Sequence, residues 1–403
     1  MLAVEFDNDV NPVTQDYLTG QIARANHDRY DAVVILLDTP GGLSESMRKI
    51  VKKELASSVP VIVYVSPDGS RAASAGVWIG QAADILAMAP QTNIGSSTPI
   101  NLGGENIQSD LRRKIVNDAA ASLKVLAKTH GRNVQWADDA VRKASNLPAY
   151  AALQQHVIDV TAPSLPVLLE KIDGRKTIPK GFVLHTAGAE VETAKMGFWK
   201  RLLDTLIDPN LIALMLSLGV LGIVVELWHP GLIFPAAFGV LSLAIAFYGL
   251  DVLPVSWAGV ILIVAAFAFW IIELFVAFSH GALAVAGAVC FVFGSLLLFD
   301  PAGSGYQVSL PVALAVAGTF TAFFVLALTK IVQIRRRPPA VGTNTLLGLH
   351  GQVRHDGLVA IRGELWQARS EDEERLEPGE EVEVAGVEGL ELVVRPAREP
   401  ATV

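Results

Sequence analysis

The chain has 403 residues, of which 51% are hydrophobic and only 18% are charged. Its mean hydropathy of +0.42 is too high for an ordinary soluble enzyme or a disordered chain. The formal net charge of −8, without a long basic run, argues against a nucleic-acid partner. A single cysteine, Cys290, excludes an intrachain disulfide framework and a cysteine-based zinc site.

Residues 1–190 have the mixed composition of a soluble domain, and strand-like segments alternate with helix-like ones. Short, continuous apolar runs indicate buried parallel strands, at 32–38, 60–65 and 84–88. Helical patterns occupy 43–56 and the stretch RAASAGVWIGQAA, and a long amphipathic helix is expected at 109–130. This β-α-β-α order predicts an α/β domain with right-handed crossovers.

Residues 206–334 hold most of the hydrophobic excess and are predicted to form a transmembrane domain of about five helices. Each apolar stretch has about 19–24 residues, enough to cross about 30 Å of hydrocarbon as a helix. The stretches are 210–228, 231–250, 256–278, 281–299 and 309–332. Glu226 and Glu273 fall near the ends of two of them, which favours interfacial placement or helix capping over an ion pathway.

Residues 342–397 are polar and acidic again. Turn residues separate five short strand-like segments, GQVRHDG, LVAIRG, ELWQARS, EEVEVAG and LELVVRP, which predicts a small β-barrel similar to an OB-fold. Many OB-folds bind nucleic acid, but the acidic block LEPGEEVEVAGVEGLE favours a protein-interaction or assembly module.

The membrane orientation is indicated by the basic residues that flank the spans. Arg335, Arg336 and Arg337 follow the last span directly, and this dense group predicts a cytoplasmic C-terminus. Five spans then place the N-terminal domain outside the cytoplasm. The opening residues MLAVEFDNDVNP do not look like a signal peptide, so we expect either a start downstream of the natural one or the opposite orientation.

Two segments of the N-terminal domain could carry chemistry. The run DTPGG, residues 38–42, follows a buried strand, and its paired glycines can leave backbone N–H groups free for an oxyanion. A plain tight turn is the alternative. Ser74, in the run ASAG, is flanked by small residues at a helix N-terminus, where the dipole favours developing negative charge. Its alternative role is that of an ordinary helix N-cap.

A serine nucleophile needs a general base, and none of the eight histidines lies between residues 29 and 129. A lysine kept neutral by burial is the other usual base. The helix expected at 109–130 supplies Lys114, Lys124 and Lys128. Lys114 falls near one face with Leu111 and Val125, which makes it the candidate to point inward; a solvated lysine is the alternative.

The motifs DTPGG, ASAG, NIGSSTPI and KIVND, in this order and followed by several spans and a small β-domain, resemble the long form of the NfeD family. These are membrane-bound serine proteases of the ClpP class, described as partners of stomatin. The resemblance implies a ClpP/crotonase-like spiral for residues 1–190 and an OB-fold for the tail. By position it also implies that Ser74 is the nucleophile and Lys114 the general base. Gly41, Gly42 and Ala75 match the oxyanion-hole positions.

The resulting hypothesis is a membrane-anchored serine endopeptidase with a Ser-Lys dyad, which needs no metal or cofactor. The resemblance implies a multi-pass protein of the cell membrane, surrounded by lipid and assembled as a homo-oligomer. It also implies a stomatin/prohibitin-like partner, whose apolar segments are the peptide substrate. The alternatives are a non-catalytic scaffold for stomatin-type assemblies and an acyl-CoA enzyme of the crotonase type, which would need an acid/base carboxylate in its pocket.

Overall fold

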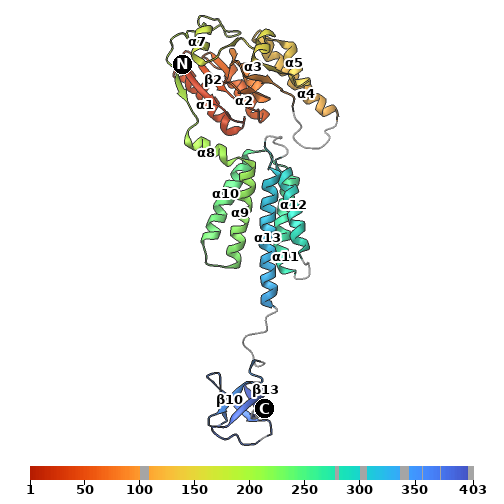
Figure 1. The fold of residues 1–403 in the computed structure, drawn as a ribbon. Helices are drawn as coiled ribbons and strands as arrows, with labels where there is room; N and C mark the ends of the chain where they lie inside the picture. Colours follow the sequence, from red (N-terminus) through yellow and green to blue (C-terminus); the bar gives the residue numbers. More distant parts are fainter. Residues whose placement is uncertain are drawn as a thin grey trace. The chain divides into compact units, whose positions relative to one another are not determined.

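The computed structural model describes residues 1–99, 109–276, 281–299, 306–335, 345–355, 357–372 and 374–397 (Figure 1). The chain separates into two compact units, Met1–Phe324 and Val325–Val403. The strands of the N-terminal α/β domain are β1 Leu2–Phe6, β2 Val33–Leu37, β3 Val61–Val65, β4 Arg71–Ala72, β5 Ile85–Met88, β6 Asn93–Gly95, β7 Asn146–Pro148, β8 Val160–Thr161 and β9 Glu192–Ala194. Its helices are α1 Pro12–His27, α2 Ser44–Leu55, α3 Ala75–Ala82, α4 Ser109–Thr129, α5 Val134–Arg142, α6 Ala149–Gln154 and α7 Leu165–Ile172.

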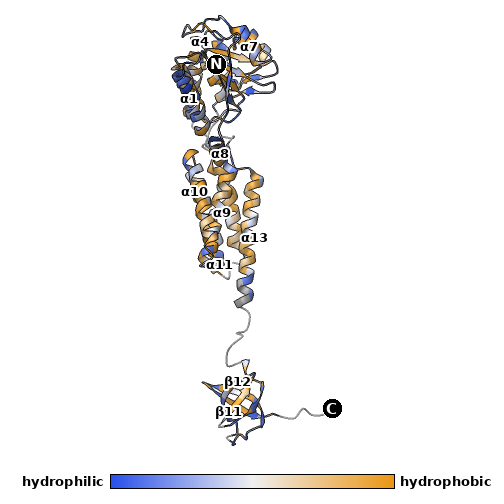
Figure 2. Cartoon of the chain, turned by 90° about the vertical axis from the view of Figure 1, so that its left-hand side faces the viewer, coloured by the Kyte–Doolittle hydropathy of each residue, from blue (hydrophilic) through white to orange (hydrophobic). Residues whose placement is uncertain are grey.

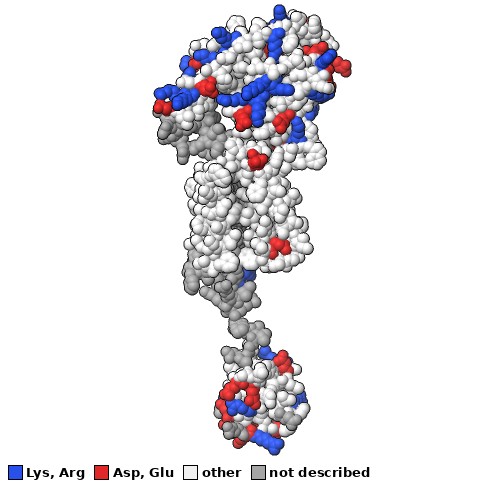
Figure 3. All heavy atoms as spheres, turned by 180° about the vertical axis from the view of Figure 1, so that it is seen from behind, with Lys and Arg blue, Asp and Glu red and all other residues white. Residues whose placement is uncertain are grey.

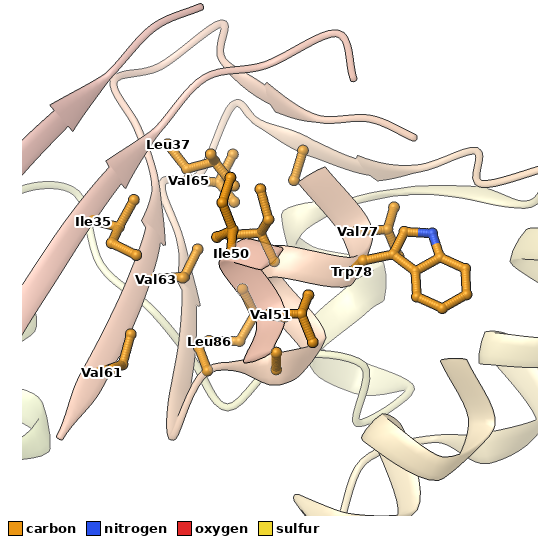
Figure 4. Close-up of a cluster of buried hydrophobic side chains, with 14 of the residues drawn as sticks. Ile35, Leu37, Ile50, Val51, Val61, Val63, Val65, Val77, Trp78 and Leu86 are labelled. Carbon is orange, nitrogen blue, oxygen red and sulfur yellow. The ribbon is translucent and has the colours of Figure 1, made fainter. Parts of the chain in front are cut away.

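A six-stranded parallel sheet in the order β8-β5-β3-β2-β1-β9 forms the centre of this domain. The predicted strands 32–38, 60–65 and 84–88 coincide with β2, β3 and β5, which confirms the α/β class. Alternate strand residues enter cores on the two faces of the sheet. One core includes α1, α2 and α3, and the other includes α7. Figure 4 shows part of the first core, formed by Ile35, Leu37, Ile50, Val51, Val61, Val63, Val65, Val77, Trp78 and Leu86.

A second, smaller sheet in the order β4-β6-β7 crosses the end of the domain where the candidate residues lie. β4 pairs with β6 in parallel, and Thr39 forms an isolated parallel bridge with Ala72. The loop after β2 and the turn between β4 and α3 are therefore tied to each other by backbone pairing. No residue pattern in the sequence predicts this sheet.

Five apolar helices occupy the predicted membrane region: α9 Pro209–Trp228, α10 Phe234–Val252, α11 Trp257–Phe275, α12 Ala282–Leu298 and α13 Leu310–Arg335. Among the described residues, three stretches have the length and hydropathy of a full span, within α9, α10 and α13. The apolar stretches of α11 and α12 are shorter. Figure 2 shows these helices as predominantly hydrophobic, and the face in Figure 3 carries almost no charged side chains over them.

The first four of these helices pack in two pairs, α9 with α10 and α11 with α12, and in each pair a glutamate of the first helix accepts backbone hydrogen bonds. Glu226 Oε1 accepts a hydrogen bond from the Gly231 amide at 2.9 Å. Glu273 is buried and accepts from the amides of Gly281 at 2.8 Å and Leu283 at 3.0 Å. Both carboxylates thus satisfy backbone groups where a chain reverses, as the predicted capping role requires.

The C-terminal unit contains a closed barrel in the order β10-β11-β12-β14-β13. Its strands are β10 His350–Val353, β11 Leu358–Ile361, β12 Glu364–Ser370, β13 Glu381–Glu388 and β14 Glu391–Pro396. A small core of buried aliphatic side chains from all five strands fills it. The five predicted strands and the predicted barrel are confirmed, and with them the fold class of α/β domain, multi-helix membrane region and small barrel.

The α/β domain contains a buried carboxylate whose charged form is unfavourable in the fold. Glu54, at the end of α2, is fully buried, and neither of its carboxylate oxygens has a hydrogen-bond partner among the described residues. Lys180 Nζ instead donates to the Glu54 carbonyl at 2.8 Å and to Asp84 Oδ2 at 2.9 Å. Burial therefore raises the pKa of Glu54 well above its usual range, against the opposing effect of Lys180.

The raised pKa of Glu54 predicts that Glu54→Gln stabilises the protein around neutral pH. In the unfolded chain this carboxyl ionises near its ordinary pKa of about 4.3, whereas in the fold it keeps its proton to a higher pH. Between those two values the folded state binds more protons, so stability falls by up to about 1.4 kcal/mol per pH unit as pH rises. A neutral glutamine avoids this loss.

Thermal unfolding of the full chain in detergent checks this expectation. Glu54→Gln should raise Tm around pH 7, and the gain should vanish near pH 4, below the unfolded pKa. The control is Glu45→Gln in the first turn of the same helix, where the carboxylate is exposed and pairs with Lys49. A lower Tm for Glu54→Gln at neutral pH would show that Glu54 is ionised and stabilised by Lys180.

Candidate active site

The DTPGG loop leaves the carboxyl end of β2 and returns the chain toward α2. Asp38 Oδ1 accepts a hydrogen bond from the Arg71 amide at 3.0 Å, and the Thr39 amide donates to the Arg71 carbonyl at 2.8 Å. Gly41 and Gly42 have φ values of +121° and +147°. Only glycine adopts such angles without strain. The segment is therefore more than a plain tight turn, because its backbone is pinned to β4 and its glycines are conformationally required.

Ser74 occupies the turn between β4 and α3, with φ +48° and ψ −111°. A serine at positive φ is held there at a cost of about 1–3 kcal/mol by its surroundings. Ser74 is the N-cap residue of α3, but its side chain caps no backbone amide. Within the described residues the Oγ makes no hydrogen bond, so the helix-capping alternative for this hydroxyl is not what the structure shows.

The backbone on both sides of Ser74 is fixed by a strand-like segment that follows β6. The Ser74 amide donates to the Ser96 carbonyl at 2.8 Å. The Ser97 hydroxyl donates to the Ser74 carbonyl at 3.2 Å, and the Ser97 amide donates to the Ala140 carbonyl at 2.9 Å. Ser96 and Ser97 lie in the NIGSSTPI motif, and their positioning role was not identified from the sequence. Backbone pairing of this kind leaves no periodic signal in side chains.

Gly41 lies directly against Ser74. A Cβ on Gly41 would be 2.5 Å from Ser74 Cβ and 3.0 Å from Ser74 Oγ. The Gly41 carbonyl accepts from the Val10 amide at 2.7 Å, and a Cβ on Gly42 would collide with the Val10 backbone. The loop between β1 and α1 thus clamps the glycines in contact with the serine.

Two backbone N–H groups near Ser74 are available for an anionic oxygen. The Ala75 amide is at the first position of α3, where an N–H has no acceptor within its own helix. In the described part of the chain, the Gly42 amide also has no hydrogen-bond acceptor. The structure therefore brings four of the five predicted residues to one place: Gly41, Gly42, Ser74 and Ala75.

The fifth predicted residue, Lys114, lies on a different element, α4. It lies in the second turn of α4, is exposed, and makes no hydrogen bond or ion pair within the described residues. Leu111 and Val125, which were expected to turn inward with it, are 51% and 63% exposed. The buried side of α4 is formed further along by Ala120, Leu123, Leu126 and Ala127. The expectation that this face points inward is wrong.

An open cavity of about 380 Å³ borders the DTPGG loop at Pro40. Its other lining residues are Asp7, Asn8, Asp9, Asn11 and Asp204. Burial and the nearby Asp204 carboxylate raise the pKa of Asp9, and burial also raises the pKa of Asp204. Asn11 donates to Asp204 Oδ1 at 2.8 Å, which connects the start of α1 to the segment that precedes the membrane region.

Comparison with protein families matches three successive parts of the chain. Residues 1–165 match the NfeD1b N-terminal domain, residues 210–330 the NfeD integral membrane domain, and residues 343–396 the NfeD-like C-terminal, partner-binding domain. A curated relative from Pyrococcus horikoshii, the "Membrane-bound protease PH1510", is 34% identical over 96% of this chain and 90% of its own length. The chain belongs to the NfeD family.

Two further relatives of this NfeD-family chain are informative. The "Membrane protein NfeD1b" of Bacillus subtilis is 25% identical over 97% of this chain and 92% of its own length. The solved structure of the 1510-N membrane-bound stomatin-specific protease, a lysine-to-alanine mutant in complex with a substrate peptide, is 34% identical. It covers 51% of this chain and 95% of that chain, with a TM-score of 0.46. The 34% identity to the Pyrococcus horikoshii relative makes the NfeD-family chain a homologue of a membrane-bound protease, as its resemblance implied.

The contact between Gly41 and Ser74 predicts that Gly41→Ala is strongly destabilising. The new methyl group would overlap Ser74 and force an alanine into a positive φ, at a combined cost of about 2–4 kcal/mol. The matched control is Gly20→Ala, because nothing lies within 4 Å of a Cβ at this position in α1. That control should be neutral or stabilising, since alanine favours a helix by about 0.5–1 kcal/mol. Equal Tm values for the two variants would contradict this packing.

Proposed function

We propose that this NfeD-family chain is a membrane-anchored serine endopeptidase with Ser74 as its nucleophile and Lys114 as its general base. The observation that carries the proposal is the state of the Ser74 side chain. It sits on a strained turn, at a helix N-terminus, with its hydroxyl free of hydrogen bonds within the described residues and two unpaired amides beside it. Backbone strain stored at a nucleophile is typical of catalytic turns between a strand and a helix.

In the proposed reaction the deprotonated amine of Lys114 takes the proton of Ser74 as Oγ attacks the scissile carbonyl carbon. The Gly42 and Ala75 amides donate hydrogen bonds to the resulting oxyanion, and Gly41 allows the backbone to approach closely. Collapse of the tetrahedral intermediate breaks the C–N bond, and Lys114 returns the proton to the leaving amine. Water then hydrolyses the acyl-enzyme by the same route. No metal or cofactor takes part.

We propose that the dyad assembles when a substrate binds, because Lys114 is exposed on α4 and makes no contact that would hold it elsewhere within the described residues. The first turns of α4 are exposed on most sides, and an exposed ion pair between Arg48 and Asp118 links α4 to α2 at its middle. Such surface pairs contribute little free energy, so the exposed turns of α4 before Val116 can shift at low cost. Catalytic hydrogen bonds are often long in a free enzyme and shorten in its complexes.

The proposed substrate is an apolar segment of a stomatin-like membrane protein. Support comes from the relative from Pyrococcus horikoshii, which is described as specific for a stomatin homolog, and from the family's partner-binding C-terminal domain. For this chain we propose that the barrel β10–β14 binds the partner. Five membrane passes, with the Arg335–Arg337 group in the cytoplasm, would put the α/β domain on the outer side.

A non-catalytic scaffold is the second candidate, and the exposed position of Lys114 is the observation that favours it. Under this alternative the α/β domain no longer hydrolyses peptides, and the chain organises stomatin-type assemblies through its barrel and helices. The two candidates differ in whether Ser74 reacts. A peptidase turns over apolar peptides, whereas a scaffold does not.

Ser74→Ala is expected to abolish peptide cleavage without unfolding the protein. Removal of the nucleophile should lower kcat/KM by at least about 10³-fold. The measurement is hydrolysis of a panel of fluorogenic apolar peptides by the full chain in nanodiscs, with thermal unfolding as the check on folding. Ser122→Ala, which changes an exposed serine on α4, is the matched control and should keep full activity. Cleavage by Ser74→Ala at the rate of the unmodified protein would exclude this assignment.

Lys114 can be tested as a base separately from its charge. Lys114→Arg keeps the positive charge, but a guanidinium stays protonated and cannot accept the serine proton. Both Lys114→Arg and Lys114→Ala should therefore lower kcat by about 10²–10⁴-fold. Lys128→Ala, which removes an exposed lysine from the same helix, should have no effect. An active Lys114→Arg variant would mean that Lys114 contributes charge only and that another group is the base.

A further inference from the structure

The helix α8, Phe198–Leu206, turns Lys200 and Asp204 toward the α/β domain and its apolar side chains away from it. Phe198 and Trp199 are 71% and 73% exposed, and Leu202 and Leu203 are 37% and 38% exposed. These four residues recur at i, i+1, i+4 and i+5, so they share one side of the helix. We refer to them as the apolar face of α8.

The opposite side of α8 makes the contacts with the α/β domain. Lys200 Nζ donates to the Asp16 carbonyl at 3.2 Å and lies 5.8 Å from the centre of the Tyr17 ring. Asp204 accepts the hydrogen bond from Asn11. A surface helix of a soluble domain has the reverse arrangement, with its apolar stripe on the core. The α/β domain therefore holds α8 without covering its apolar face.

The chain itself places α8 next to a membrane span. Only Ile207 and Asp208 separate it from α9, and Asp208 Oδ1 caps α9 by accepting from the Asn210 and Leu211 amides at 2.9 and 3.0 Å. With so short a connection, α8 stays within a few residues of the point where the chain enters the hydrocarbon. Helices that lie in the membrane interface combine tryptophan and phenylalanine with lysine and arginine. The sequence of α8 has this composition.

We propose that α8 is an interfacial helix whose apolar face binds the bilayer at the boundary between headgroups and acyl chains. Phe198, Trp199, Leu202 and Leu203 would enter this boundary, and the exposed Arg201 at its border would meet lipid phosphates. A protein partner is less favoured than lipid on this face, because the element next to α8 is the membrane span α9.

This lipid contact is coupled to the candidate active site through a single helix. Asp204, on the polar side of α8, lines the same cavity as Pro40 of the DTPGG loop. The bilayer surface would thus hold one wall of a cavity that borders the DTPGG loop. This inference does not depend on the proposed peptidase activity, because lipid binding by α8 and cleavage by Ser74 are measured separately and either one can fail alone.

The test uses the full chain reconstituted into phosphatidylcholine–phosphatidylglycerol vesicles. Because Cys290 is the only cysteine, Cys290→Ser gives a background in which a new thiol can be labelled with an environment-sensitive fluorophore. The probe positions are Trp199→Cys and, separately, Leu203→Cys. The control is Tyr150→Cys in α6 of the α/β domain, a site whose 71% exposure is close to the 73% of Trp199. Nitroxide-bearing lipids serve as quenchers.

The expected result is a blue-shifted emission at both α8 positions, with roughly twofold or greater quenching by nitroxides placed near the headgroups, as for a helix about 5–10 Å deep. Nitroxides at the end of the acyl chains should quench less, and the Tyr150→Cys label should show water-like emission without quenching. Water-like emission at positions 199 and 203 would overturn the proposal. Blue-shifted emission without lipid quenching would also overturn it, since a protein surface would then cover α8.

A label-free variant keeps the proposal testable if the thiol variants fold poorly. The double variant Phe198→Ser with Trp199→Ser should release α8 from the bilayer and accelerate tryptic cleavage after Lys200 and Arg201 in intact vesicles by roughly tenfold. Tyr150→Ser should leave that cleavage rate unchanged. Equal rates for the double variant and the unmodified chain would show that lipid does not protect α8.

Discussion

The close approach of Gly41 to Ser74 is the constraint on which the candidate site depends. Any side chain at position 41 would overlap the serine. Gly41 and Ser74 both have a positive φ, which a residue with a side chain adopts only with strain. Val10 from the first loop and Ser96 from beyond β6 hold the two backbones in place. Because these segments come from separate parts of the domain, the serine is presented only when the whole α/β fold is assembled.

Much of this fold could be predicted from residue patterns. Continuous apolar runs located β2, β3 and β5 to within one residue, since a strand buried on both faces has no polar positions. Length and hydropathy located the five apolar helices, and alternation between turn residues located the barrel. The small sheet β4-β6-β7 was missed because strands of two or three residues are too short to show a period. Two of the five apolar helices are also shorter than predicted.

The candidate site was predictable where glycine and serine form short local motifs, as in DTPGG and ASAG. It was not predictable where a side chain's direction depends on tertiary packing. Heptad spacing suggested that Lys114 points inward, but the side of α4 that packs on the core begins at Val116. In α8 the same kind of spacing predicts a core-facing stripe, yet the apolar residues face outward. Periodicity identifies an amphipathic face and leaves open what covers it.

The backbone contacts of Glu226 and Glu273 have a consequence for how the membrane region is assembled. Glu226 binds the Gly231 amide, and Glu273 binds the amides of Gly281 and Leu283, so each of these contacts lies within one helix pair. Glycines bring the paired helices into backbone contact, as where Gly222 meets Gly239. A helix pair held together by such internal contacts can enter the bilayer as one unit. The two pairs can therefore insert in succession, before α13 and the barrel have left the ribosome.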